Sequence, residues 1–215
     1  ITEALSPMGR MGPAVQIETD GEDRPDESLA PLPDWRDCDP ADLKQRITAA
    51  GIVGMGGAAF PTVVKLSPPP SKPVSVLILN GVECEPCLTA DHRLMLEAPE
   101  KIVTGALIIA RILGINAVHI GIELNKPDAI ETMQRAAKGT GINVQGLRVR
   151  YPQGAEKQLI YALTGRRVPT SGLPMDVGAV VQNVGTALAV AEAVLEGKPL
   201  YERVTTVTGT PVAAP

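Results

Sequence analysis

The sequence predicts an α/β fold in which helices sandwich a parallel β-sheet. The apolar runs at residues 76–79 and 117–122 are continuous rather than alternating, which is typical of strands buried on both faces. Helical patterns separate these runs, and strands that alternate with helices form parallel βαβ units. Proline and glycine mark helix ends: Pro99 opens an apolar helix, and Gly114 closes it.

The other elements follow from similar signals. Asp39 is a candidate N-cap, Pro40 occupies the first helical position and Gly51 ends the helix. Apolar residues at helical spacing predict a further helix over 126–138, and a third strand is expected over 144–151. Two more helices are expected over 156–164 and 183–195, the second one after a short apolar run at 180–181.

The N-terminal 38 residues do not have the composition of a domain. Residues 15–17 favour one short strand, and residues 18–39 are dense in Asp, Glu and Pro, which predicts a solvated linker. Trp35 is expected to pin this linker onto the domain. The chain starts with Ile1 rather than Met, and we expect both ends to lie inside a longer protein. We therefore divide the chain into a segment and acidic linker from a preceding domain (1–38), a ligand-binding α/β domain (39–202) and the start of a further domain (203–215).

The composition argues against some classes of function. The net charge of -4 and the lack of a basic stripe argue against a nucleic-acid surface. The most apolar stretch, residues 102–113, is too short to cross a bilayer and contains Arg111, so we expect no direct membrane insertion. Three cysteines are too few for a disulfide scaffold and fit a reducing compartment.

A glycine-rich loop is the first candidate for ligand binding. Gly54, Gly56 and Gly57 would let backbone N–H groups approach an anion, and Lys65 follows with a positive charge. A dinucleotide-binding fingerprint would need a strand before the loop, whereas a helix precedes this one. We therefore reject the Rossmann interpretation; a tight structural turn is the alternative to a ligand loop.

The second candidate follows the strand at 76–79, at the edge where open α/β sheets bind ligands. Asn80 both donates and accepts hydrogen bonds, and Glu83 and Glu85 can accept them from a ligand. The alternative is a polar turn with solvated acids. Cys84 and Cys87 form a C-x-x-C motif; a zinc site lacks further ligands, a redox dithiol is the second possibility, and incidental cysteines are the favoured interpretation.

Two more loops sit at helix starts. One lies where the strand 144–151 passes into a helix and contains Tyr151, Gly154 and Glu156. An acid such as Glu156 is also common in a first helical turn for its interaction with the helix dipole alone. Gln182, Asn183 and Thr186 can hold a phosphate or ring-edge atoms, and Asn183 can alternatively cap a helix. Together the four loops lack a nucleophile–base pair. They suit a phosphorylated cofactor better than hydrolytic chemistry, so we assign no catalytic residue and no metal ligand.

Four ordered motifs carry a resemblance to a known family. GxGGAxFPTxxK (54–65), NxxExEPxxxxDxR (80–93), YPQGxE (151–156) and QNVxT (182–186) resemble the flavin domain shared by the flavoprotein subunit of respiratory complex I and the C subunit of the Rnf electron-transport complex. The amino-acid sequences of the last two motifs are most similar to those of the Rnf C subunit. The resemblance runs from about residue 39 to 209 and implies an FMN-binding domain of the complex I flavoprotein type.

The resemblance also implies roles. FMN would lie along Gly54, Gly56, Gly57 and Lys65, with Asn80 at the flavin or its ribityl phosphate. Tyr151, Gly154 and Glu156 would border the ring, and Gln182, Asn183 and Thr186 would hold the phosphate end. NADH would bind above the flavin at Phe60, Glu85 and Glu156. Ala59 departs from the pattern, because the family usually has glycine there, and with alanine we expect that the backbone cannot freely take positive φ.

The wider family implies an NADH-oxidising or NAD-reducing module of a membrane-associated, ion-translocating complex. Two [4Fe–4S] clusters would lie C-terminal to this chain, and a β-grasp domain would begin at residue 203. Partners would be other Rnf subunits, including membrane subunits and an iron–sulfur B-type subunit, at the cytoplasmic face of the bacterial inner membrane. The alternatives are a non-catalytic scaffold, like the A subunit of the sodium-pumping quinone reductase, and the β subunit of a soluble hydrogenase or formate dehydrogenase.

Overall fold

Four parallel strands form the central sheet of the domain. The computed structural model describes residues 1–5, 9–22, 24 and 27–209, and within them this sheet has the order β5–β4–β3–β6. The strands are β3 (Val76–Gly81), β4 (Val118–Glu123), β5 (Asn143–Leu147) and β6 (Ala179–Asn183). Asn80 pairs with Asn183 across β3 and β6, so two of the predicted amides lie side by side at the carboxyl end of the sheet.

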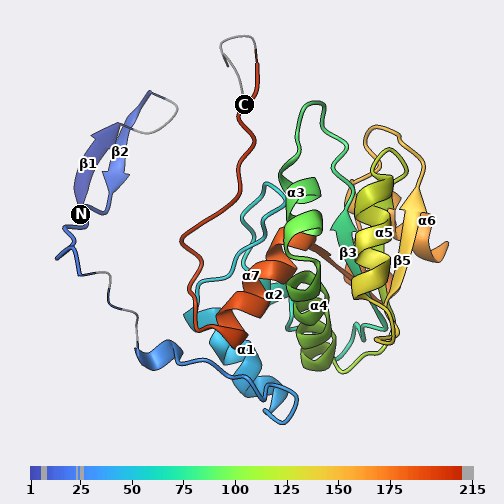
Figure 1. Ribbon diagram of the computed structural model, residues 1–215, viewed down its shortest axis with the longest axis horizontal. Coiled ribbons are helices and arrows are strands. Elements are labelled where there is room, and N and C mark those ends of the chain that lie inside the picture. Colours follow the sequence, from blue (N-terminus) through green and yellow to red (C-terminus); the bar gives the residue numbers. More distant parts are fainter. Residues whose placement is uncertain (6–8, 23, 25–26, 210–215) are drawn as a thin grey trace.

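Helices cover both faces of the sheet, which confirms the predicted fold class (Figure 1). One face carries α1 (Pro40–Ala49), α3 (Ala90–Glu97), α4 (Pro99–Leu113), α5 (Pro127–Ala136) and α7 (Val184–Leu195), and the other carries α6 (Glu156–Thr164). Successive residues of β3 point to opposite layers: Leu77 and Leu79 pack toward α4 and α7, and Val76 and Ile78 toward α6. Both faces of the strand are therefore buried, as its continuous apolar run predicts.

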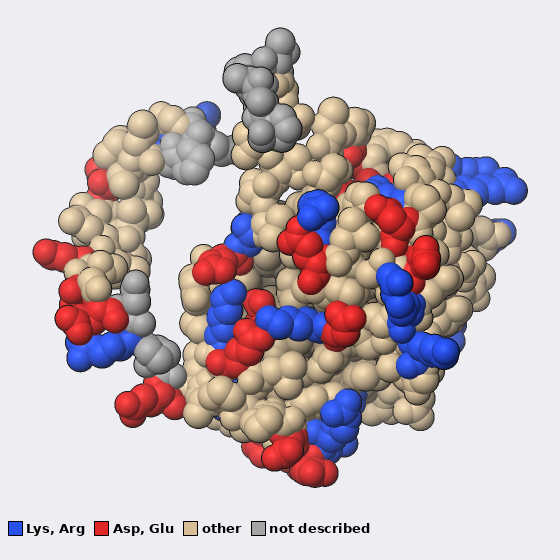
Figure 2. Space-filling model, in the orientation of Figure 1, with Lys and Arg blue, Asp and Glu red and all other residues tan. Residues whose placement is uncertain are grey.

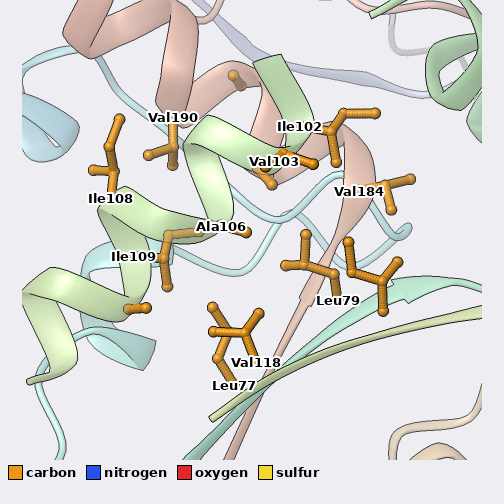
Figure 3. Packing of buried hydrophobic residues seen from close by; sticks show 14 of the residues in the cluster. Leu77, Leu79, Ile102, Val103, Ala106, Ile108, Ile109, Val118, Val184 and Val190 are labelled. Atoms are coloured by element: carbon orange, nitrogen blue, oxygen red, sulfur yellow. The ribbon is translucent and has the colours of Figure 1, made fainter. Parts of the chain in front are cut away.

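The main core lies between the sheet and the crossing of α4 with α7. Figure 3 shows Leu77 and Leu79 below Ile109 and Ala106 of α4, with Val190 of α7 close by. Gly105 lets the two helices approach, since a Cβ on it would lie 1.8 Å from the backbone oxygen of Ala187. This crossing fixes α7, and therefore Asn183 at its start, relative to the sheet.

Most predicted element ends are confirmed. The Asp39 side chain accepts the Ala41 N–H at 2.7 Å, Gly51 and Gly114 are left-handed after their helices, and Trp35 is buried in the main core. The strand predicted over 144–151 is too long: β5 stops at Leu147 because its only neighbour, β4, ends opposite it at Glu123.

Three further differences concern short elements. The strand expected at 15–17 is wrong; instead β1 (Thr2–Leu5) and β2 (Met11–Ala14) form an antiparallel hairpin. Neither α3 nor the single turn α2 (Thr62–Lys65) was predicted from the sequence. Both are too short to show a clear helical period.

The chain beyond α7 continues along the domain. Residues 203–209 form no regular element, although the Thr206 hydroxyl accepts the Thr89 N–H at 3.0 Å, and residues 210–215 lie outside the described part. Within the described ranges, no helix is both long and apolar enough to span a membrane. On the face shown in Figure 2, acidic and basic side chains are interspersed.

Candidate functional site

A cavity of about 600 Å³ runs along the free edge of β6 and around its carboxyl end. The glycine-rich loop and α2 form one wall, and residues 173–175 form another. Nine of the predicted site residues contribute to its lining: Gly54, Gly56, Phe60, Lys65, Asn80, Gly154, Glu156, Gln182 and Asn183. The four predicted loops therefore converge on one space, which lies beside the sheet as well as at its carboxyl edge.

The glycine-rich loop is closed at its base and takes positive φ near its tip. Val53 pairs with Pro61, and the Gly54 N–H donates to the Phe60 carbonyl at 2.8 Å. Gly57 has a φ of +113°, which favours glycine, and Ala59 has a φ of +48°. Ala59 therefore takes positive φ even though it replaces the glycine that is usual in the family.

Lys65 and Glu156 meet across the cavity wall. The Lys65 Nζ donates to Glu156 Oε1 at 2.5 Å and to the backbone oxygen of Val181 at 3.0 Å. Lys65 ends α2 and Glu156 starts α6, so the pair joins the two sides of the site. The lysine charge is already compensated, and the pair presents a dipole to a ligand instead of a free cation.

Asn80 and Gly154 bring the loop before α6 against the end of β3. The Asn80 Nδ2 donates to the Gly154 carbonyl at 2.9 Å, and its Oδ1 accepts the Val82 N–H at 3.0 Å. A Cβ on Gly154 would lie 2.8 Å from the Val82 backbone oxygen. Glycine is therefore required at 154 for close backbone approach.

Asn183 is held by two partners. Its Oδ1 accepts the Gly185 N–H at 2.8 Å, which confirms the helix-capping interpretation, and its Nδ2 donates to Asp91 Oδ2 at 2.7 Å. Burial raises the pKa of Asp91 to about 6; Glu83 adds to this rise, while the bond from Asn183 and the charges of Arg203 and Lys126 oppose it. Asn183 thus caps α7 and lines the cavity at once.

Gln182 carries a polar atom without a partner. Its side chain is 2% exposed and lines the cavity, and its Nε2 has no hydrogen-bond acceptor among the described residues. An unpaired buried donor is costly, by about 1–3 kcal/mol. A ligand with an acceptor atom in the cavity would remove this cost.

Four predicted residues do not contribute to the cavity lining. Gly57 lies at the loop tip, and Thr186 is fully buried, where its hydroxyl accepts the Met55 N–H at 2.9 Å. Tyr151 is exposed and donates from its hydroxyl to Glu85 Oε1 at 3.1 Å, so these two residues meet outside the cavity. Thr186 therefore fastens the glycine-rich loop onto α7.

Part of the cavity wall was not predicted from the sequence. Leu173, Pro174 and Met175 line the cavity from the start of the short 3-10 helix η2 (Pro174–Val177), and an element this short has no periodic pattern that would reveal its role. Arg203, which we assigned to the following region, donates to the Met55 carbonyl at 3.3 Å. Asp91 belongs to a motif that we recognised, but its burial beside Asn183 has no signal in the sequence.

The cysteines stay outside this arrangement. Cys38, Cys84 and Cys87 are free thiols, and Cys87 is exposed with a φ of +68°. Among the described residues, no group of three or more His, Cys, Asp or Glu side chains is placed to hold a metal ion.

The parallel sheet, the glycine-rich loop and the amide-lined cavity define an α/β cofactor-binding domain. The family model described as the Nuo51 FMN-binding domain matches residues 47–192, and the chain belongs to this family.

Its relatives include C subunits of ion-translocating oxidoreductases. The chain is 54% identical over 202 residues to the C subunit of the proton-translocating ferredoxin:NAD(+) oxidoreductase complex of Clostridium ljungdahlii, covering 94% of this chain and 44% of the relative. It is 49% identical over 203 residues to the C subunit of the Na(+)-translocating ferredoxin:NAD(+) oxidoreductase complex of Acetobacterium woodii, covering 94% of this chain and 46% of the relative. The chain thus spans less than half the length of these relatives.

A solved structure has a similar fold. The structure of an NAD+-reducing [NiFe]-hydrogenase in the H2-reduced state matches with a TM-score of 0.64 and 28% identity, over 80% of this chain and 33% of that one.

Proposed function

We propose that the cavity binds FMN and that the chain is the NADH-oxidising or NAD-reducing module of an ion-translocating electron-transport complex. The observation that carries the proposal is the convergence of four separate loops on one cavity, whose lining residues include Gln182 with its unpartnered buried amide. Family membership and the names of the relatives support the same conclusion.

The residues present fit such a cofactor. A cavity of about 600 Å³ falls within the range of roughly 300–1,000 Å³ usual for small-molecule sites. The Gln182 Nε2 lacks an acceptor that a flavin could supply, and Gly154, which packs closely against Val82, also lines the cavity. Asn80, Lys65 and Glu156 would border the ring, and Asn183 with the glycine-rich loop would face the phosphate end.

The chain's own part in the reaction is binding and orientation. Bound FMN would supply hydride transfer with nicotinamide, and this chemistry needs no general base. Phe60 lines the cavity and is 45% exposed, so its ring is available to stack against a ring of NADH. Glu85, with its Tyr151 partner, and Glu156 would accept hydrogen bonds from the nucleotide.

The wider role rests on the relatives. Electrons would pass between FMN and two [4Fe–4S] clusters in a region outside this chain. The partners would be the other subunits of an Rnf complex, including membrane subunits and an iron–sulfur B-type subunit, at the cytoplasmic face of the inner membrane. The identity of 54% to an Rnf-type relative, against 28% to the hydrogenase, favours this assignment over a soluble hydrogenase component.

Fluorescence titration with FMN tests the site. The wild-type chain should quench flavin fluorescence, and Lys65→Ala and Asn183→Ala should each weaken binding about 10- to 100-fold, since each removes a polar partner of the site. Lys138→Ala, a change at an exposed lysine outside the cavity lining, is the control and should bind as wild type does. Circular dichroism should show that each variant is folded, because Asn183 also caps α7.

Two outcomes would count against the proposal. Unchanged affinity in both variants would refute the placement of the cofactor. A wild-type chain that binds no FMN would instead favour the non-catalytic scaffold.

A further inference from the structure

We infer that Asp91 is a positioning residue of the cofactor site: it holds the Asn183 side chain at the cavity wall, and its proton controls how strongly the site binds an anionic cofactor. The inference rests on the proposed function, because it concerns the affinity of the same cavity. The glycines, lysine and amides that define the site in the sequence do not include Asp91.

The geometry places Asp91 one hydrogen bond from the cavity. Asn183 lines the cavity, its Oδ1 is committed to the Gly185 N–H, and its Nδ2 donates to Asp91 Oδ2 at 2.7 Å. A carboxylate at 91 therefore fixes the rotation of the Asn183 amide. If this acceptor is removed, only the bond to Gly185 remains to orient the side chain.

The backbone of Asp91 is itself held in place. The Glu83 carboxylate, from the loop after β3, accepts the Asp91 N–H at 2.9 Å and the His92 N–H at 3.3 Å. Asp91 lies in the first turn of α3, so Glu83 ties that turn to the end of the sheet. The loop after β3 and the first turn of α3 together therefore fix the position of the Asp91 carboxylate.

The charged groups that face Asp91 are committed elsewhere. Glu83 faces it from the β3–α3 loop, Lys126 from the start of α5 and Arg203 from the segment after α7. Lys126 is paired with Glu123 at 3.1 Å, and Arg203 donates to the Met55 carbonyl at 3.3 Å. Neither cation therefore neutralises the Asp91 carboxylate by direct pairing.

Burial raises the pKa of Asp91 to about 6, so this carboxyl group changes charge near neutral pH. Above pH 6 its negative charge opposes an anionic phosphate in the cavity. When protonated it is neutral, and its other oxygen can still accept the Asn183 N–H. Binding of the anion should therefore take up a proton and should strengthen as the pH falls.

Asp91→Asn isolates the charge from the hydrogen bond. Asparagine keeps an acceptor oxygen for Asn183 but does not titrate. The FMN dissociation constants of wild type and Asp91→Asn should be measured by fluorescence quenching between pH 5 and 8. The phosphate of FMN titrates in the same range, but it does so equally for both proteins, so the ratio of their constants reports Asp91 alone.

The ratio of the wild-type constant to the Asp91→Asn constant should be near one at pH 5 and rise to about tenfold by pH 8, which corresponds to a shift of about one pKa unit on binding. Asp42→Asn, in the exposed first turn of α1, is the matched control and should give a flat ratio. A ratio for Asp91→Asn that is constant across this range would overturn the inference.

Asp91→Ala tests the positioning role. It removes the acceptor as well as the charge, so FMN should bind more weakly than to Asp91→Asn even at pH 5. Equal affinity of the alanine and asparagine variants at every pH would show that Asp91 does not position Asn183. If neither wild type nor Asp91→Asn binds FMN at any pH, the proposed function fails and the inference fails with it, whereas bound FMN with a constant ratio overturns the inference alone.

Discussion

At the scale of single residues, the polar groups of the cavity are largely satisfied by one another. Lys65 bonds Glu156, Asn80 bonds Gly154, and Asn183 bonds Asp91. Gln182 is the exception, with a buried Nε2 that has no acceptor among the described residues. A cofactor that bonds the Gln182 amide would add a hydrogen bond there, whereas at the other polar groups it would replace or extend existing ones.

The raised pKa of Asp91 also affects stability. Because folding raises this pKa from 3.8 to about 6, the folded protein keeps a proton that the unfolded chain releases. This contribution to stability is complete below pH 4 and is lost as the pH rises through 6. Two pKa units correspond to about 3 kcal/mol, which solvent screening of this partly buried group reduces toward about 2 kcal/mol.

Asp91→Asn should therefore gain stability relative to wild type by about 2 kcal/mol between pH 4 and pH 7.5. Urea denaturation of both proteins at the two pH values measures this difference, and the titration of all other groups cancels in the comparison. A stability difference that is the same at both pH values would show that Asp91 has an ordinary pKa.

Residue types in the sequence were sufficient to identify much of the site. Glycines at 54, 56 and 154 and amides at 80, 182 and 183 follow apolar runs or precede helices, and these positions converge in the structure. The apolar wall at Leu173 and Met175 could not be predicted, since a single turn of 3-10 helix is too short to show an apolar period. The ion pair of Lys65 with Glu156 depends on a distance between α2 and α6 that no local signal encodes.

At the scale of elements, the crossing of α4 and α7 places the amide-bearing end of β6. The two helices meet at Gly105, where backbone of α7 occupies the space that a side chain would need. The sequence predicts both helices from proline, glycine and apolar spacing. It does not predict their close contact, because a glycine inside a helix can have several structural roles.

Gly105→Ala should destabilise the fold by about 3 kcal/mol or more, since α4 and α7 must separate to accept the methyl group. The midpoint of urea unfolding reports this loss. Thr104→Ala, one residue earlier on the same helix, is the control and should change stability by less than about 1 kcal/mol. A Gly105→Ala variant as stable as the control would contradict the close helix contact.

At the scale of the whole molecule, the segment after α7 returns to the site. Arg203 donates to the glycine-rich loop, and Thr206 accepts a hydrogen bond from Thr89, just before α3, so hydrogen bonds cross our boundary at 202. Figure 1 shows the segment after α7 running alongside the domain. The N-terminal hairpin is drawn apart from the sheet in the same view. The fold class could be predicted from the order of strands and helices. The contacts of the segment after α7 could not, because they depend on tertiary structure alone.

The central claim is that this chain binds a flavin that exchanges electrons with a nicotinamide nucleotide. Anaerobic absorbance spectra of the purified chain, recorded after adding FMN and then NADH, test it most directly. We expect the spectrum of bound flavin to form and then to bleach when NADH is added. Bound flavin that keeps its absorbance with excess NADH, while a chemical reductant bleaches it, would contradict the account.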